Sequence, residues 1–304
     1  MRRLPLLMII LLLAGTDARA QLRATSVEKL PLPADRFWAA PKFSPDGGSI
    51  YYSTAGFDGI WEYRIAGGAI RQITADPRSG YGFALSADGK SIAWRRTRQA
   101  EGSLDRLQEI VVARLAGGAP EVAAGGVTLS TPVFSGDALL FTDQAQLRSV
   151  RGGSAGTAIL GVENTKIVLV RGGARTLYDP VGSGFYLWPS LSPDGAALLA
   201  FEQRTGTFVA DLEGNVLSRL GRRDAPVWTR DGRWVVFMDA KDDGHDFVSS
   251  DIACIRRDGT GVSRLTASTD TIELYPDCSP AGDRIVCQTA AGEILLITYR
   301  EDGR

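Results

Sequence analysis

The stretch FSPDGGSIYY, residues 43–52, decides the fold, because its pattern returns five more times along the chain. The related stretches are LSADGKSIAW (85–94), FSGDALLF (134–141), LSPDGAALLAF (191–201), WTRDGRWVVF (228–237) and CSPAGDRIVC (278–287). In the fullest form an apolar residue precedes a turn, in which proline fixes φ, aspartate caps the local backbone and glycine accepts a positive φ. The repeated unit is therefore a tight antiparallel hairpin.

After each turn, apolar residues fall at every second position, as in a strand with one buried face. The predicted buried pairs are Ile50 and Tyr52, Ile92 and Trp94, Leu139 and Phe141, Val235 and Phe237, and Ile285 and Cys287. Further strand pairs follow in residues 59–74, 109–123 and 251–266, which gives four strands per unit. Units that return about every 40–60 residues predict an all-β, six-bladed β-propeller of four-stranded antiparallel blades.

The last unit supports the same fold, because it shows a hairpin at 278–288 and a third strand at 293–299 but no outer strand. Residues 25–30, near the start of the chain, have the pattern of the missing strand. We expect this N-terminal strand to close the last blade, which leaves no unpaired edge between the first and last blades.

The SPDG-type hairpins, the stretch DGTGVSRLT at 258–266 and the closing strand resemble the WD-repeat-like propellers of the TolB family. The resemblance covers nearly the whole chain after residue 20, and it implies the fold more strongly than a function. Related propellers serve as protein-binding scaffolds, glycan-associated proteins and parts of peptidases and lyases. We expect two departures from the pattern: no further domain before the propeller, and an extra segment at residues 161–185. We interpret the extra segment as an inserted hairpin, with a degenerate seventh blade as the alternative.

Residues 1–20 have the features of a secretory signal peptide: Arg2 and Arg3, an apolar run from Leu4 to Leu13, and a small-x-small site ending at Ala20. No cysteine follows the run, so we expect no lipid anchor, and no segment has the length of a membrane span. Residues 21–304 are expected to form one periplasmic or secreted, monomeric propeller domain. The formal net charge of −1 disfavours nucleic acid as a partner.

Strand direction places the irregular connections on one face of the ring, which we call the loop-rich face. It should carry residues 36–40, 77–82, 185–188, 222–226 and 268–275 and the inserted hairpin, with the longer loops 95–106 and 239–251. Trp38, Tyr81, Trp188 and Tyr275 come just before inner strands, so we expect them near the mouth of the central channel, where they would suit a peptide or a sugar. The competing interpretation is that they fill the channel or pack between blades.

The loop that begins at Asp239 is acidic and contains Asp242, Asp243, His245 and Asp246. A solvated loop is the favoured interpretation; a basic partner or a calcium site at Asp239, Asp242 and Asp243 is the alternative. The loop fails the EF-hand pattern, because Lys241 and Ser250 stand where oxygen ligands are needed. His245 is the single histidine of the chain, which excludes a multi-histidine metal site. We predict no cofactor.

Residues 152–156 match the G-x-S-x-G motif of hydrolases, but Ser154 would lie in a hairpin turn on the face opposite His245. We therefore predict no hydrolase site there. Of the three cysteines, Cys278 and Cys287 share one face of one hairpin, in a diagonal register that suits a disulfide poorly. Buried thiols are favoured, a Cys278–Cys287 disulfide stays open, and Cys254 is expected to be unpaired.

These observations predict a non-catalytic binding or scaffold protein of the cell envelope that recognises a protein or peptide through the loop-rich face. The alternative is a glycan-binding or glycan-processing propeller of the lyase or hydrolase type. The two differ in what they require: cleavage of a glycan needs exposed aromatic residues beside two convergent carboxylates, whereas protein binding needs a broad mixed surface around residues 239–251.

Overall fold

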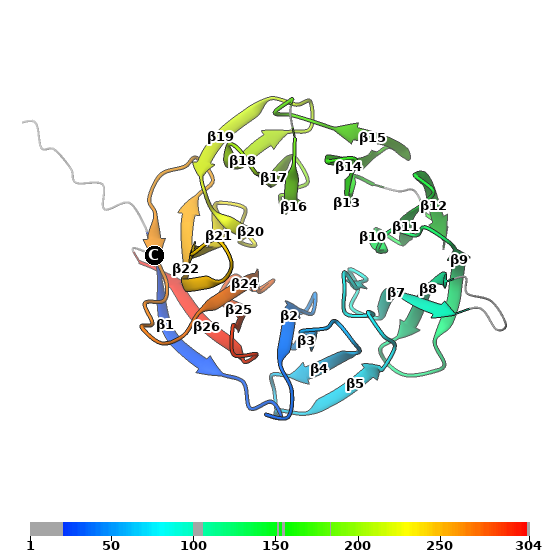
Figure 1. The fold of residues 1–304 in the computed structure, drawn as a ribbon, viewed down its shortest axis with the longest axis horizontal. Helices are drawn as coiled ribbons and strands as arrows, with labels where there is room; N and C mark the ends of the chain where they lie inside the picture. The colour runs from blue at the N-terminus through cyan, green and yellow to red at the C-terminus, as the bar shows by residue number, and fades with distance from the viewer. Residues whose placement is uncertain (1–20, 100–105, 151, 154–155, 183, 303–304) are drawn as a thin grey trace, which may run out of the picture.

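A computed structural model describes residues 21–302 apart from residues 100–105, 151, 154–155 and 183, and its 26 elements are all β-strands. The strands form seven sheets arranged as a ring around a central opening (Figure 1). The all-β propeller is confirmed, but the prediction of six blades is wrong, since there are seven. The expected signal peptide and Ser154 lie outside the described residues.

The first four blades follow one another along the chain. Blade 1 contains β2 (Trp38–Phe43), β3 (Ser49–Thr54), β4 (Ile60–Arg64) and β5 (Ile70–Thr74). Blade 2 contains β6 (Ala84–Leu85), β7 (Ser91–Gln99), β8 (Arg106–Arg114) and β9 (Glu121–Gly126). Blade 3 contains β10 (Val133–Ser135), β11 (Ala138–Asp143) and β12 (Gln146–Val150), and blade 4 contains β13 (Ala158–Glu163), β14 (Lys166–Arg171) and β15 (Ala174–Tyr178).

The remaining three blades have four strands each. Blade 5 contains β16 (Tyr186–Leu191), β17 (Ala197–Glu202), β18 (Gly206–Asp211) and β19 (Val216–Gly221). Blade 6 contains β20 (Asp224–Trp228), β21 (Trp234–Asp242), β22 (Phe247–Arg256) and β23 (Ser263–Arg264). Blade 7 contains β24 (Glu273–Cys278), β25 (Arg284–Thr289), β26 (Ile294–Glu301) and, as its outer strand, β1 (Leu22–Lys29).

Blade 4 is the segment that we interpreted as an inserted hairpin. Its central strand fills the ring on both sides: Ile167 packs in the core shared with blade 5, and Val168 packs in the core shared with blade 3. Its turns are two-residue connections at 164–165 and 172–173, in which all four residues have positive φ. Because they lack the SPDG pattern, counting that pattern missed the blade. The alternative, a degenerate seventh blade, is the arrangement found.

Blades 3 and 4 also reverse the direction of the chain. Four antiparallel strands return the chain to the face on which it started, but three leave it on the other face. After β12, Gly153 and Gly156 lie beside Asp137 and Ser135 at the β10–β11 turn, so β13 starts from that face. Its turn at 164–165 therefore lies on the loop-rich face, and β15 brings the chain back there for blade 5.

The closure of the ring is as predicted, although the last blade is the seventh. β1 pairs antiparallel with β26, with Leu22 opposite Glu301 and Lys29 opposite Leu295. Two strands from opposite ends of the described chain thus complete one sheet (Figure 1).

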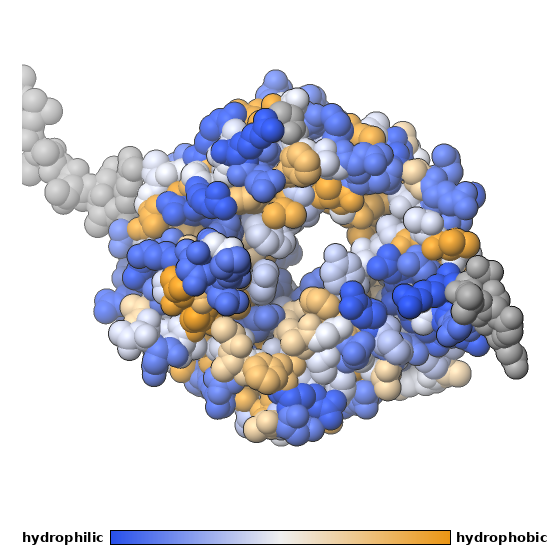
Figure 2. Space-filling view, in the orientation of Figure 1, coloured by the Kyte–Doolittle hydropathy of each residue, from blue (hydrophilic) through white to orange (hydrophobic). Residues whose placement is uncertain are grey.

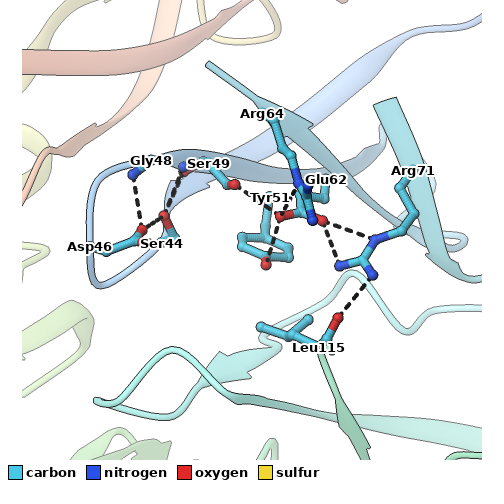
Figure 3. A network of polar contacts seen from close by, with 9 residues as sticks. All are labelled: Ser44, Asp46, Gly48, Ser49, Tyr51, Glu62, Arg64, Arg71 and Leu115. Atoms are coloured by element: carbon cyan, nitrogen blue, oxygen red, sulfur yellow. Dashed lines mark hydrogen bonds and ion pairs between the residues drawn. The ribbon is translucent and has the colours of Figure 1, made fainter. Parts of the chain in front are cut away.

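The repeated turn is held by the side chains that define its sequence. In blade 1, Ser44 Oγ donates to Asp46 at 2.5 Å, and Asp46 accepts the Gly48 N–H at 2.9 Å (Figure 3). The hydroxyl also accepts the Ser49 N–H at 2.9 Å. Equivalent Ser/Thr–Asp bonds recur at Ser86–Asp88, Ser192–Asp194 and Thr229–Asp231. In blade 7, where Ala281 takes the aspartate position, Ser279 bonds to Asp283 instead. The turn motif thus satisfies the backbone groups that a tight reversal leaves unpaired.

The alternating residues after each turn form the cores between blades. All ten residues of the predicted buried pairs are 0–2% exposed. Behind the blade 1 turn, Glu62 is also buried and accepts hydrogen bonds from Ser49, Tyr51 and Arg71 (Figure 3). Arg71 donates onward to the carbonyl of Leu115 at 2.9 Å, which ties blade 1 to blade 2.

In the described part of the chain, no helix has the length and apolar character needed to cross a membrane.

Candidate functional site

A cavity of about 800 Å³ opens at the mouth of the channel on the loop-rich face. It collects residues from blades 2, 4, 5, 6 and 7, among them three of the four aromatic residues that we predicted there: Tyr81, Trp188 and Tyr275. We call these three residues and the cavity the aromatic mouth. Figure 2 shows a passage through the centre of the ring, with apolar residues on its rim beside β13 and β16.

The backbone of the inner strands explains why two of these rings lie at the mouth. In blades 1, 5, 6 and 7 the inner strand has an irregular register, and one residue has a left-handed φ: Ala40 (52°), Trp188 (50°), Ala225 (45°) and Tyr275 (52°). Gly82 (72°) holds the same position in blade 2. A large side chain rarely adopts this conformation, and residues that do so cluster at functional sites.

The three rings reach solvent to different degrees, and two of them have a fixed aromatic neighbour. Tyr81 is 51% exposed and meets Phe57 edge-on, with ring centroids 5.3 Å apart. Trp188 meets Phe201 in the same way at 5.7 Å, and Tyr275 is 38% exposed. Rings that are held in place and still reach solvent can contact a ligand at a small cost in conformational entropy.

Charged groups complete the mouth. Asp224 and Asp242 line the cavity with Arg222, whose guanidinium lies 5.5 Å from the centre of the Phe201 ring. Burial raises the pKa of Asp224; Arg222 lowers it, and the charges of Asp242 and Asp239 raise it further. Burial, followed by the charge of Asp224, raises the pKa of Tyr275. Two carboxylates against one guanidinium leave the mouth negative when Asp224 is ionised.

Trp38, predicted at the mouth, is instead part of the core. It is 5% exposed, donates its indole N–H to the Pro33 carbonyl at 2.7 Å, and meets the rings of Tyr52 and Trp61. The strand register equates Trp38 with Tyr186, which is also buried, and not with Trp188. The interpretation that the aromatic residues pack between blades is therefore correct for Trp38.

The acidic residues of the loop that begins at Asp239 face different partners and do not converge on one point. Asp239 lies 3.4 Å from Arg264 and 4.0 Å from Arg223, whereas Asp242 turns to the mouth. Asp243 accepts the backbone N–H groups of His245 and Asp246 at 3.0 and 2.9 Å, and all three of these residues are exposed at the hairpin tip.

These contacts bear on the calcium alternative. Among the described residues, no three His, Cys, Asp or Glu side chains converge as a metal site would require. The structure therefore gives no support to calcium at Asp239, Asp242 and Asp243.

The three cysteines are free thiols. Cys278 pairs in register with Ile285, which leaves Cys287 diagonal to it and no disulfide between them. Burial raises the pKa of all three thiols, that of Cys254 to about 12.

A second cavity, of about 590 Å³, lies deeper in the channel and was missed by reasoning from sequence. Lys42 and Asp277 are the charged side chains among its described lining residues. Both occupy the position two residues after the left-handed one, where other blades carry Ala84, Val133, Ser190 and Val227. The signal was present in the sequence: in blades 1, 5, 6 and 7 a proline separates the two positions, as in Ala40-Pro41-Lys42 and Tyr275-Pro276-Asp277.

Comparison with known proteins supports the fold. No family model matches the chain. An uncharacterized protein of Agrobacterium fabrum is 32% identical over 106 residues, which are 33% of this chain and 34% of that protein. The match thus spans about a third of the relative's length.

Three solved structures resemble the chain. TolB from Acinetobacter baumannii is 18% identical with a TM-score of 0.53, over 79% of this chain and 56% of that one. Oligogalacturonate lyase from Vibrio parahaemolyticus is 12% identical with a TM-score of 0.51, over 92% and 96%. The Swd1 propeller of Myceliophteria thermophila is 8% identical with a TM-score of 0.63, over 91% and 99%. They share the β-propeller fold, and membership of the TolB family stays a prediction.

Proposed function

We propose that this chain is a non-catalytic binding protein, which takes an extended peptide segment of a protein partner into the aromatic mouth. The observation that carries the proposal is the conformation of Trp188 and Tyr275. Both are held with left-handed φ at a position where blades 1, 2 and 6 carry alanine or glycine. The conformation costs roughly 1–2 kcal/mol for a residue with a side chain. It recurs at Ala40 and Ala225, so it belongs to the inner strands; in blades 5 and 7 it places a large ring at the cavity, where a ligand can contact it.

The surroundings of the mouth suit a peptide. The cavity combines apolar ring surface with a few polar groups, as ligand sites generally do. The long hairpins β7–β8 and β21–β22 extend the loop-rich face beyond it and can contact the rest of the partner. The export expected from residues 1–20 would place that partner in the cell envelope.

The test is affinity selection from a pool of acetyl-capped random heptapeptides on the immobilised full chain, read by mass spectrometry. The Trp188→Ala/Tyr275→Ala variant should lose at least about tenfold of the retained peptide, because aromatic anchors dominate binding energy. Leu217→Ala is the matched control, since Leu217 is exposed on the outer strand of blade 5. Equal retention by all three proteins would refute the proposal.

Glycan processing is the second candidate, and one observation favours it. Asp224, whose pKa is raised, lies with Asp242 beside exposed aromatic rings, which is the pairing of carboxylates that glycosidic cleavage needs. The negative mouth suits neutral sugars better than uronic acids. Release of reducing ends from neutral polysaccharides by the wild type, absent with Asp224→Asn, would support this candidate over the first.

A further inference from the structure

The channel continues from the aromatic mouth to the deeper cavity. Gly161 and Pro189 line both cavities, and the passage through the ring is open in the space-filling view (Figure 2). A peptide bound at the mouth can therefore extend inward alongside the inner strands. The positions of the charged residues along these strands decide which of them the peptide meets at the mouth and which it meets deeper in the channel.

Lys42 is the cation at the deeper level. Its ammonium group lies 5.3 Å from the centre of the Phe83 ring and 3.5 Å from the Phe83 carbonyl. No ion pair within 4.0 Å joins it to a carboxylate among the described residues, although its side chain is open to the channel. Although Lys42 is exposed to the channel, the surrounding protein desolvates its ammonium group and lowers its pKa; the charge of Asp277 partly offsets this effect. An ammonium group left without a close counterion in a cavity is a natural partner for an anion.

Asp277, the other charged group at this level, already has a partner. Its Oδ2 accepts the Phe43 N–H at 2.8 Å. Burial raises the pKa of Asp277, whereas the hydrogen bond from the Phe43 N–H and the charge of Lys42 lower it. The Asp277 carboxyl is thus held by the backbone of blade 1, whereas Lys42 has no close carboxylate among the described residues, so Lys42 is the group at this level that can bind an anion.

The depth between the two charged levels follows from the strand positions. Asp224 comes one residue before the left-handed position of its strand, and Lys42 comes two residues after that of its own. Three strand residues that include a bulge correspond to roughly 7–10 Å, which an extended peptide covers with two or three residues.

Resting on the proposed function, we infer that the peptide binds end-on: its C-terminal carboxylate reaches Lys42, and a basic residue two or three positions earlier lies between Asp224 and Asp242. The carboxylates of the mouth and the ammonium group of the deeper cavity then match the basic residue and the C-terminal carboxylate of one short segment. Binding of this kind selects free chain ends over internal segments.

The experiment uses the heptapeptide pool in two forms, one with a free C-terminal carboxylate and one with a C-terminal carboxamide. A charge-assisted hydrogen bond in this setting is worth roughly tenfold to a hundredfold in affinity. The wild type should therefore retain the free acids at least about tenfold better, with Lys or Arg enriched two or three positions before the end. Lys42→Met should abolish the preference, and Lys90→Met, at an exposed turn of blade 2, should not.

The outcomes separate the two proposals. If both pools are retained equally, and the retention still depends on Trp188 and Tyr275, end-on binding is wrong and peptide binding stands. If Arg222→Met abolishes the preference for free acids and Lys42→Met does not, the carboxylate sits at the mouth and the inference is also wrong. If neither pool is retained by the wild type, both proposals fail.

Discussion

Removal of Arg71 should expose how much the buried network of blade 1 contributes to stability. Glu62 is 5% exposed and accepts two hydrogen bonds from Arg71, at 3.0 Å from Nε and 2.6 Å from a terminal nitrogen. Removing one partner of a fully buried ion pair costs about 3–5 kcal/mol. Because the Arg71 side chain is 41% exposed, and Ser49 and Tyr51 still donate to the carboxylate, we expect about 2–3 kcal/mol for Arg71→Met.

The same carboxylate provides the control. Arg64 lies 3.7 Å from Glu62, but its side chain is 60% exposed, so Arg64→Met should cost less than about 0.5 kcal/mol. Thermal unfolding of a chain this long shifts by about 2–4 °C per kcal/mol, so Arg71→Met should lower Tm by about 4–12 °C. A double-mutant cycle that combines Arg71→Met with Glu62→Gln should give an interaction free energy of at least about 1 kcal/mol. Equal effects of the two arginine substitutions would refute the reasoning.

Three further predictions concern the mouth, the turns and the thiols. Burial raises the pKa of Asp224 in the folded chain above its unfolded value, so the folded state loses stability as the pH rises through the folded pKa; Asp224→Asn should therefore have the higher Tm at pH 7.5, and the difference should shrink towards pH 4. A Cβ added at Gly206 (φ 83°) would lie 2.6 Å from the Gly221 carbonyl, whereas one at Gly172 (φ 57°) meets nothing within 4 Å. Denaturant titration should thus show a loss of about 3 kcal/mol for Gly206→Ala and about 1 kcal/mol for Gly172→Ala, and equal losses would contradict the role of the carbonyl. Because Cys254 and Cys287 are buried and burial raises the pKa of both thiols, iodoacetamide at pH 8 should leave these two unmodified in the native protein and label them after denaturation, as mass spectrometry would show.

The sequence predicted the propeller because its turns carry their own physical signature. Serine, aspartate and glycine in the turn, followed by alternating apolar residues, mark the inner hairpins of six of the seven blades in full or in part, and they predicted the buried residues of five blades. Blade 4 needs none of them, because its two-residue turns at 164–165 and 172–173 reverse the chain with positive φ alone. The number of blades therefore could not be read from the turns.

The aromatic residues of the site could also be predicted in part from their positions in the repeats. Tyr81, Trp188 and Tyr275 lie at the mouth, but of these only Tyr81 comes before its inner strand. Trp188 and Tyr275 lie within β16 and β24 at the left-handed position, and Trp38 comes two residues before that position in β2. Aligning the repeats on the proline of Ala40-Pro41 would have corrected this. That Asp224 and Asp242 meet at one cavity depends on the curvature of blade 6 and its long hairpin, which no spacing in the sequence encodes.

The pairing of β1 with β26 gives the ring an unusual assembly order. β1 comes before every other described strand, yet it has no partner in the sheet until β26 is in place. The entropy lost in joining such distant segments grows only with the logarithm of the length between them, so six preformed blades can hold the two ends in reach at a modest cost. The seventh sheet is thus complete only when the two ends of the described chain have met, and until then the outer edge of β26 is unpaired.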